Sequence, residues 1–135
     1  MTESTSAFKC RTISTGCLKN LLTRKMKLQL WNVQRASEYR TDLNIPGSEW
    51  VPARAINRSF VERRVRDKAE PLVVYSCDRA CSQPREAAKA LRGLGCSLVF
   101  VYRGGIKEWG KAGLPLVSGR FLLLERSKEQ TAATV

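Results

Sequence analysis

The chain has 135 residues, a length that suits one domain with a single core. Hydrophobic residues make up 43% and charged residues 27%, which is typical of globular proteins and argues against disordered, collagen-like and coiled-coil classes. The 24 Lys and Arg against 12 Asp and Glu give a net charge of +12, which favours anionic partners. Because the basic residues are dispersed and match no nucleic-acid-binding motif, nucleic acid is expected to bind only nonspecifically.

The amino-terminal stretch MTESTSAFKC lacks the apolar core of a signal sequence, and the longest apolar runs are too short to span a bilayer. We therefore expect a cytoplasmic protein with no membrane contact. Cysteines in that compartment are mostly reduced, and five are present: Cys10, Cys17, Cys77, Cys81 and Cys96. Since the chain has no histidine and its cysteine spacings differ from those of zinc knuckles, no structural metal site is expected.

The first predicted elements are a helix and a strand. Residues 13–25 (ISTGCLKNLLTRK) have leucines at helical spacing after a possible N-cap at Ser14 or Thr15, which predicts a short amphipathic helix. Residues 28–33 (LQLWNV) predict a strand with apolar residues on both faces, as a sheet covered on both sides needs.

A turn and two short elements follow. Pro46-Gly47 indicates a turn, and Trp50 and Val51 suggest a short strand. Residues 58–67 (RSFVERRVRD) predict a short helix with its apolar side chains pointing inward.

The second half of the chain has the clearest pattern. Residues 71–76 (PLVVYS) predict a buried strand. Ser82 is a candidate cap for the next helix, Pro84 suits its first turn, and Gly93 and Gly95 end it.

Another strand, residues 97–102 (SLVFVY), leads through a Gly-Gly turn into a short helix within residues 103–115. Strands that alternate with helices favour an α/β fold with a central, mainly parallel sheet flanked by helices on both faces. Ligands bind such sheets beyond the carboxyl ends of the strands, which draws attention to the loop after Tyr75.

That loop contains Cys77 and Cys81. A loop between a strand and a helix N-terminus presents backbone N–H groups and the positive end of a helix dipole, which lower the pKa of a cysteine and hold an anion. Arg79 and Arg85 would add positive charge. A Cys-His dyad is excluded because the chain has no histidine. The alternative is that both cysteines are small apolar residues packed beneath the loop.

Residues 71–116 (PLVVYSCDRACSQPREAAKALRGLGCSLVFVYRGGIKEWGKAGLPL) closely resemble the C-terminal half of a rhodanese domain, most specifically in YRGGIKEWGKAGLP. Residues 28–52 (LQLWNVQRASEYRTDLNIPGSEWVP) resemble its N-terminal half more loosely. The resemblance covers residues 12–118. It leaves an N-terminal extension, 1–11, and a polar tail, 119–135, which is expected to be partly disordered.

The resemblance implies a rhodanese-like α/β fold and a single-domain sulfurtransferase. In this family a loop cysteine takes a sulfane sulfur from thiosulfate or a similar anion, becomes a persulfide, and passes the sulfur to a thiol, cyanide or a partner protein. No cofactor or metal is implied. The candidate catalytic residues are Cys77 and Cys81. The candidate substrate-binding residues in the loop are Asp78, Arg79, Ala80, Ser82 and Arg85.

The sequence departs from the family pattern at several positions. Asn32, Gln34 and Asn44 replace an Asp, an Arg and a His that usually support the scaffold. Aligned without a gap, Ser76 takes the place of the catalytic cysteine, and Cys81 matches the second cysteine of a longer-loop subgroup.

Counting back from Ala87-Ala88 instead places Cys77 near the catalytic position. We favour Cys77 as the nucleophile because it opens the loop, with Cys81 as the alternative nucleophile or a resolving thiol. The competing hypothesis is a catalytically inactive module for protein interaction or regulation. A phosphatase-like or oxyanion reductase activity is less favoured, because the loop arginines lie two and eight positions after Cys77 instead of about six.

Overall fold

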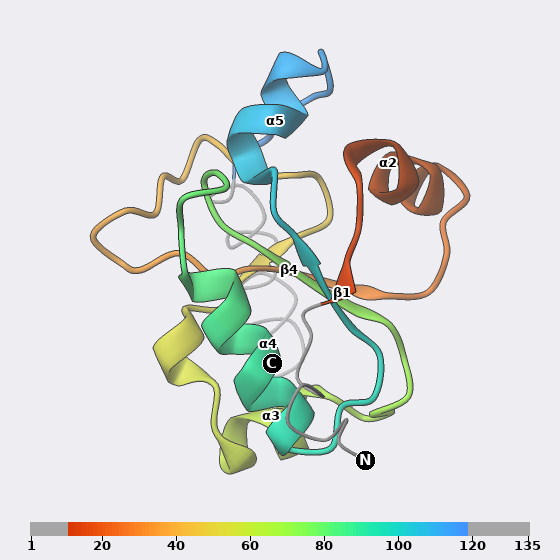
Figure 1. Ribbon diagram of the computed structural model, residues 1–135, viewed down its shortest axis with the longest axis vertical. Helices are drawn as coiled ribbons and strands as arrows, with labels where there is room; N and C mark the ends of the chain where they lie inside the picture. Colours follow the sequence, from red (N-terminus) through yellow and green to blue (C-terminus); the bar gives the residue numbers. More distant parts are fainter. Residues whose placement is uncertain (1–10, 119–135) are drawn as a thin grey trace, which may run out of the picture.

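A computed structural model describes residues 11–118 (Figure 1). Five strands form one sheet in the order β1-β5-β4-β2-β3, and every neighbouring pair is parallel. The predicted parallel α/β sheet is therefore confirmed, and the carboxyl ends of its strands share one edge. The strands are β1 (Arg11–Thr12), β2 (Gln29–Asn32), β3 (Glu49–Trp50), β4 (Leu72–Tyr75) and β5 (Val99–Tyr102).

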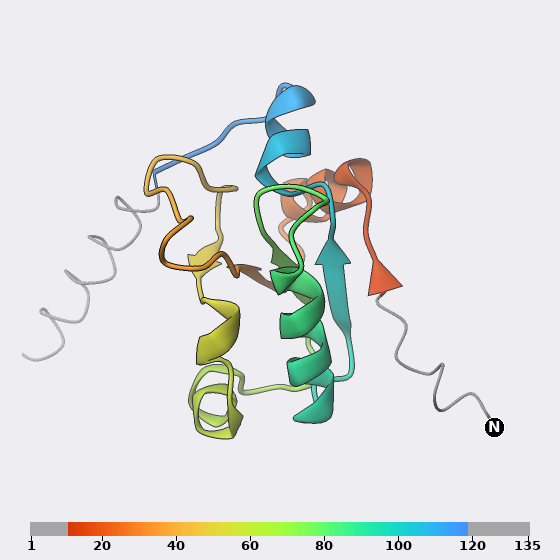
Figure 2. The same cartoon turned by 60° about the vertical axis from the view of Figure 1, so that its left-hand side comes forward.

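Helices cover both faces of this sheet, as predicted. One core cluster lies under α3 (Arg58–Arg64), α4 (Gln83–Gly93) and the 3-10 helix η1 (Ala53–Ala55). The other lies under α2 (Thr15–Thr23) and α5 (Gly105–Lys111). Figure 2 shows α5 at the same end of the molecule as the loop between β4 and α4. Among the described residues, no helix is both long and apolar enough to cross a bilayer.

The strand β4 is apolar at every position because both of its faces are buried. Successive strand residues point to opposite faces, so Leu72 and Val74 join the core under α3 and α4. Val73 and Tyr75 join the core under α2 and α5. All four side chains are at most 1% exposed. A strand buried on both faces has no polar alternation, which is the pattern that LVVY displays.

Packing around α5 explains several residues of the signature YRGGIKEWGKAGLP, residues 102–115, called the C-terminal signature below. Trp109 is buried, and its indole Nε1 donates a hydrogen bond to the carbonyl of Pro115 at 2.8 Å. The amide of Leu114 donates to the carbonyl of Trp109 at 3.2 Å. Between them the chain reverses at Gly113, whose φ of +80° lies in the region that favours glycine. These contacts close the end of α5 onto the segment that follows.

Ser82 occupies the N-cap position of α4, as predicted, but its side chain makes no capping hydrogen bond. Its backbone is helical, with φ −91° and ψ −15°, whereas a capping side chain requires an extended backbone to reach the first free amides. The Ser82 hydroxyl instead donates to Glu86 Oε2 at 3.1 Å. Pro84 does lie in the first turn of α4, as predicted.

The strand β1 was not predicted, because two residues carry no periodicity and the strand exists only through pairing with β5. The expectations for Cys10 and for the tail 119–135 fall outside the described residues.

Candidate active site

The cysteine loop, defined here as residues 76–82, joins β4 to α4 at the carboxyl edge of the sheet. This is the position that the sequence predicted for a ligand site. The strand that precedes it is firmly held, because the buried Tyr75 hydroxyl accepts from the amide of Ile45 at 3.1 Å and lies 2.8 Å from Ser48 Oγ. The loop therefore starts from a fixed point.

The start of α5 sets the orientation of the first peptide groups in the cysteine loop. The amide of Ile106 donates to the carbonyl of Ser76 at 3.1 Å, and the amide of Lys107 donates to the carbonyl of Cys77 at 2.9 Å. In a trans peptide the N–H points opposite to the C=O. With both carbonyls turned toward α5, the N–H groups of Cys77 and Asp78 point into the loop.

Gly105 allows this close approach. Its φ is +64°, and a Cβ at this position would collide with the carbonyl oxygen of Ser76 and lie 2.9 Å from the carbonyl carbon of Cys77. The second glycine of the Gly-Gly turn is therefore required both for its backbone conformation and for space.

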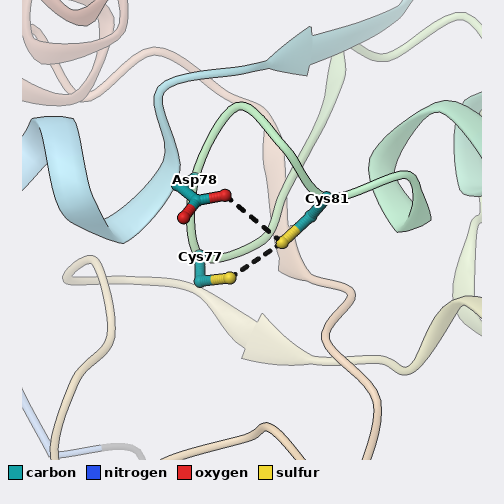
Figure 3. Close-up of side chains that lie close together, drawn as sticks. All are labelled: Cys77, Asp78 and Cys81. Carbon is teal, nitrogen blue, oxygen red and sulfur yellow. Dashed lines mark hydrogen bonds between the residues drawn. The ribbon is translucent and has the colours of Figure 1, made fainter.

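Within the loop the two cysteine sulfurs meet. Cys77 Sγ lies 2.8 Å from Cys81 Sγ, and Cys81 Sγ lies 3.7 Å from Asp78 Oδ1 (Figure 3). Both cysteines are half-buried, so their sulfurs remain open to small molecules. Ser76 is 1% exposed, and its hydroxyl has no hydrogen-bond partner among the described residues. Ser76 is therefore the deeply buried residue beneath the two half-buried cysteines.

The two thiols differ in acidity. Burial, the hydrogen bond to Cys81 and the charges of Cys81 and Asp78 together raise the pKa of Cys77 to about 11. Burial also acts to raise the pKa of Cys81, but the nearby side chains of Cys77 and Ser76 and the backbone of Asp78 and Cys77 outweigh it. The pKa of Cys81 is therefore lowered. Of the two thiols, Cys81 is the more acidic.

Basic residues surround Cys81. A small pocket beside its sulfur is lined by Arg79, Arg85 and Arg103, and Asp78, Pro84 and Val101 complete the lining. Arg79 and Arg85 were predicted for substrate binding, and the structure brings both to this pocket. Arg103 was missed by the sequence reasoning, although it directly precedes the Gly-Gly pair. An arginine pocket next to a thiolate suits a small anion.

Arg79 is not free, because it forms a two-point ion pair with Glu108 of α5. This pair connects the cysteine loop to α5 a second time, through side chains. Glu108 was not predicted as a site residue. The only sequence signal for it is its place in the C-terminal signature.

The other predicted residues mainly shape the loop. Asp78 Oδ1 accepts from the amide of Ala80 at 2.9 Å, and the carbonyl of Asp78 accepts from the amide of Cys81 at 3.3 Å. Ala80 is exposed and lines a neighbouring shallow pocket with Arg79. Ser82 is engaged with Glu86. These contacts curl the chain so that Cys81 returns over Cys77.

One set of possible metal ligands occurs among the described residues. The Cys77 and Cys81 sulfurs and an Asp78 carboxylate oxygen all lie within 4.8 Å of one another. Two thiolates with one carboxylate would suit a thiophilic cation such as zinc, with solvent as the fourth ligand.

The sequence itself identifies the family. A profile of the family described as "Rhodanese-like domain" matches residues 14–112. The chain belongs to the rhodanese-like domain family. No curated protein sequence matches this chain closely enough to count as a relative.

Solved structures share its fold. The BH2092 protein of Bacillus halodurans superposes with a TM-score of 0.72 at 22% identity, covering 81% of this chain and 77% of that one. The rhodanese-like domain of the Anabaena Alr3790 protein gives 0.68 at 22% identity, covering 82% and 80%. A thiosulfate sulfurtransferase of Pseudomonas aeruginosa gives 0.65 at 22% identity, covering 82% of this chain but 20% of that protein. These likenesses establish the fold alone.

Asn32, Gln34 and Asn44, which stand where the family pattern has an Asp, an Arg and a His, form a neutral hydrogen-bonded network. Asn32 Nδ2 donates to Gln34 Oε1 at 3.0 Å and to Asn44 Oδ1 at 2.9 Å. Asn32 Oδ1 accepts from the amide of Gln34 at 3.0 Å. All three residues are at most 3% exposed. Their departure from the family pattern therefore preserves a connected, hydrogen-bonded support at the end of β2.

Proposed function

We propose that this rhodanese-like domain is a sulfurtransferase that carries sulfane sulfur on Cys81. The thiolate of Cys81 attacks the outer sulfur of thiosulfate or a similar donor, the donor S–S bond breaks, and sulfite leaves with the bonding electron pair. A thiophilic acceptor then attacks the terminal sulfur of the persulfide, and the Cys81 thiolate is released.

The observation that carries the proposal is the surroundings of Cys81 Sγ. The inward N–H groups of Cys77 and Asp78 stabilise a negative sulfur, and the Ser76 hydroxyl, which has no partner among the described residues, is available to donate to it as well. The pocket with Arg79, Arg85 and Arg103 suits a sulfur-donor anion. Family membership and the fold shared with a thiosulfate sulfurtransferase agree with this chemistry.

The choice of Cys81 differs from the preference for Cys77 drawn from the sequence. Cys77 opens the loop, but the pKa of its thiol is raised, whereas the pKa of Cys81 is lowered. A thiolate is the reactive form of cysteine, so the more acidic thiol is the better candidate. The proposal therefore assigns the sulfur to Cys81.

Mass spectrometry after thiosulfate treatment tests this assignment. In samples quenched at early times we expect a gain of one sulfur atom that maps to Cys81, accompanied by sulfite release. Cys81→Ser should lower thiosulfate-to-cyanide transfer by at least about 100-fold, because the covalent route is lost. The exposed Cys17 of α2 provides a matched control, and Cys17→Ser should retain wild-type loading.

Two results would contradict the proposal. Sulfur mapped to Cys77 in the wild type would reverse the roles of the two cysteines. Neither sulfite release nor loading on either residue, with a correctly folded protein by circular dichroism, would favour the alternative of an inactive interaction module.

A further inference from the structure

The two sulfurs of the cysteine loop are nearly close enough to bond. Their separation of 2.8 Å is about 0.8 Å longer than a disulfide bond. They are four residues apart in a loop, and neither side chain is clamped in a regular element. A small adjustment of the loop would therefore join Cys77 to Cys81.

We propose that Cys77 is a resolving thiol that discharges the persulfide of Cys81 as sulfide and forms a Cys77–Cys81 disulfide. This inference rests on the proposed function, because Cys81 must first carry the sulfur. It adds a second activity, the reductive release of sulfide, and names thiols as the co-substrates that complete the cycle.

The step balances within the loop. The proton of Cys77 passes to the terminal sulfur of the Cys81 persulfide, and the resulting thiolate attacks Cys81 Sγ. The Cys77–Cys81 bond forms, the sulfane S–S bond breaks, and the terminal sulfur leaves as HS⁻ with the electron pair. The two cysteine sulfurs are each oxidised by one electron, and the sulfane sulfur is reduced by two.

The position of the two sulfurs favours this direction, because Cys77 Sγ lies 2.8 Å from Cys81 Sγ. Loading moves the negative charge one atom outward, to the terminal sulfur, and leaves Cys81 Sγ as the electrophile. The Cys77 proton then has an acceptor, and the nearest sulfur to Cys77 is the one that it must attack.

Regeneration requires an external reductant of the thiol class. Two thiols reduce the Cys77–Cys81 disulfide by exchange through a mixed disulfide and leave as their own disulfide. Half-burial of both cysteines allows a small thiol or an extended dithiol segment to reach them. Cyanide, by contrast, removes the terminal sulfur directly and leaves both cysteines reduced.

A single turnover with thiosulfate and no added thiol tests the inference. For the wild type we expect about one equivalent of sulfide, loss of two free thiols, and a Cys77–Cys81 cross-link in the peptide map. Cys77→Ser should instead keep a stable persulfide on Cys81 and release no sulfide. Cys17→Ser, which changes an exposed cysteine on α2, should behave as the wild type.

The outcomes separate the two proposals. A wild-type protein that loads sulfur on Cys81 but keeps the persulfide without sulfide release would overturn the resolving role and leave the sulfurtransferase proposal intact. Sulfide release by Cys77→Ser at the wild-type level would overturn it as well. If no variant loads sulfur, the sulfurtransferase proposal fails, and the resolving role falls with it.

Discussion

At the scale of single residues, the feature that distinguishes this loop is the sequence Ser76-Cys77 where the family pattern has its catalytic cysteine. Ser76 is buried at the base of the loop, and its hydroxyl lowers the pKa of both neighbouring thiols, although less than burial raises that of Cys77. The position thus supports a thiolate and does not supply one. The candidate nucleophiles are therefore the sulfurs of Cys77 and Cys81.

The unequal acidity of the two cysteines predicts separate alkylation profiles. We expect iodoacetamide to modify Cys81 with a midpoint below pH 9, the ordinary value, and Cys77 only near pH 11. In Cys81→Ala the midpoint of Cys77 should fall, because the hydrogen bond and the charge of Cys81 no longer raise its pKa. Pulse labelling with peptide mass spectrometry measures both.

Because the thiols titrate as a pair, the wild-type midpoints belong to two macroscopic steps. Equal midpoints for both cysteines, unchanged in Cys81→Ala, would contradict the proton arrangement.

At the scale of elements, α5 acts as the support of the cysteine loop. Its first amides bind the carbonyls of Ser76 and Cys77, and its Glu108 binds Arg79. The Gly-Gly turn and the buried Trp109 are therefore parts of the architecture that supports the candidate site. This explains in physical terms why the signature at residues 102–115 accompanies the loop.

The dependence of the loop on α5 predicts the effect of Gly105→Ala. A side chain at φ +64° costs about 1–2 kcal/mol, and its collision with the Ser76 carbonyl adds to that cost. We expect a lower urea midpoint and slower sulfur loading, because the amides of the loop lose their orientation.

Gly110→Ala in the same helix is the matched control. A Cβ there meets Leu116 at an ordinary 3.5 Å, and alanine favours the helix by up to about 1 kcal/mol. Equal stability and loading in both variants would show that α5 does not position the loop.

At the scale of the whole molecule, the charge of +12 is the main property that the site does not explain. Acidic side chains are half as numerous as basic ones, so they cannot neutralise them one to one. The ion pairs among the described residues include Arg40–Asp42, Arg64–Glu49 and Arg79–Glu108. The remaining field attracts small sulfur anions and polyanions alike.

This charge predicts weak nucleic-acid binding of a purely electrostatic kind. The logarithm of the affinity should fall linearly with the logarithm of salt concentration, with the same slope for unrelated sequences. Fluorescence anisotropy with two labelled oligonucleotides of different sequence would measure it. A preference between them at fixed salt would contradict the prediction.

The local elements of this protein were accessible from the sequence because their signals are local. The leucine spacing of α2, the apolar runs of β4 and β5 and the apolar face of α4 each lie within a dozen residues. Burial on both faces of β2 and β4 also followed from their lack of alternation. The position of the site at the carboxyl edge then followed from the parallel topology.

Which of the two thiols is the more acidic depends on tertiary contacts. That difference depends on the contacts of Ile106 and Lys107 with the loop carbonyls, about thirty residues away in the chain, and on the return of Cys81 over Cys77. The pairing of β1 with β5 and the approach of Arg103 are equally non-local. Hydrogen bonds and charges act through space, so the sequence could name both cysteines, and only the fold could assign their protons.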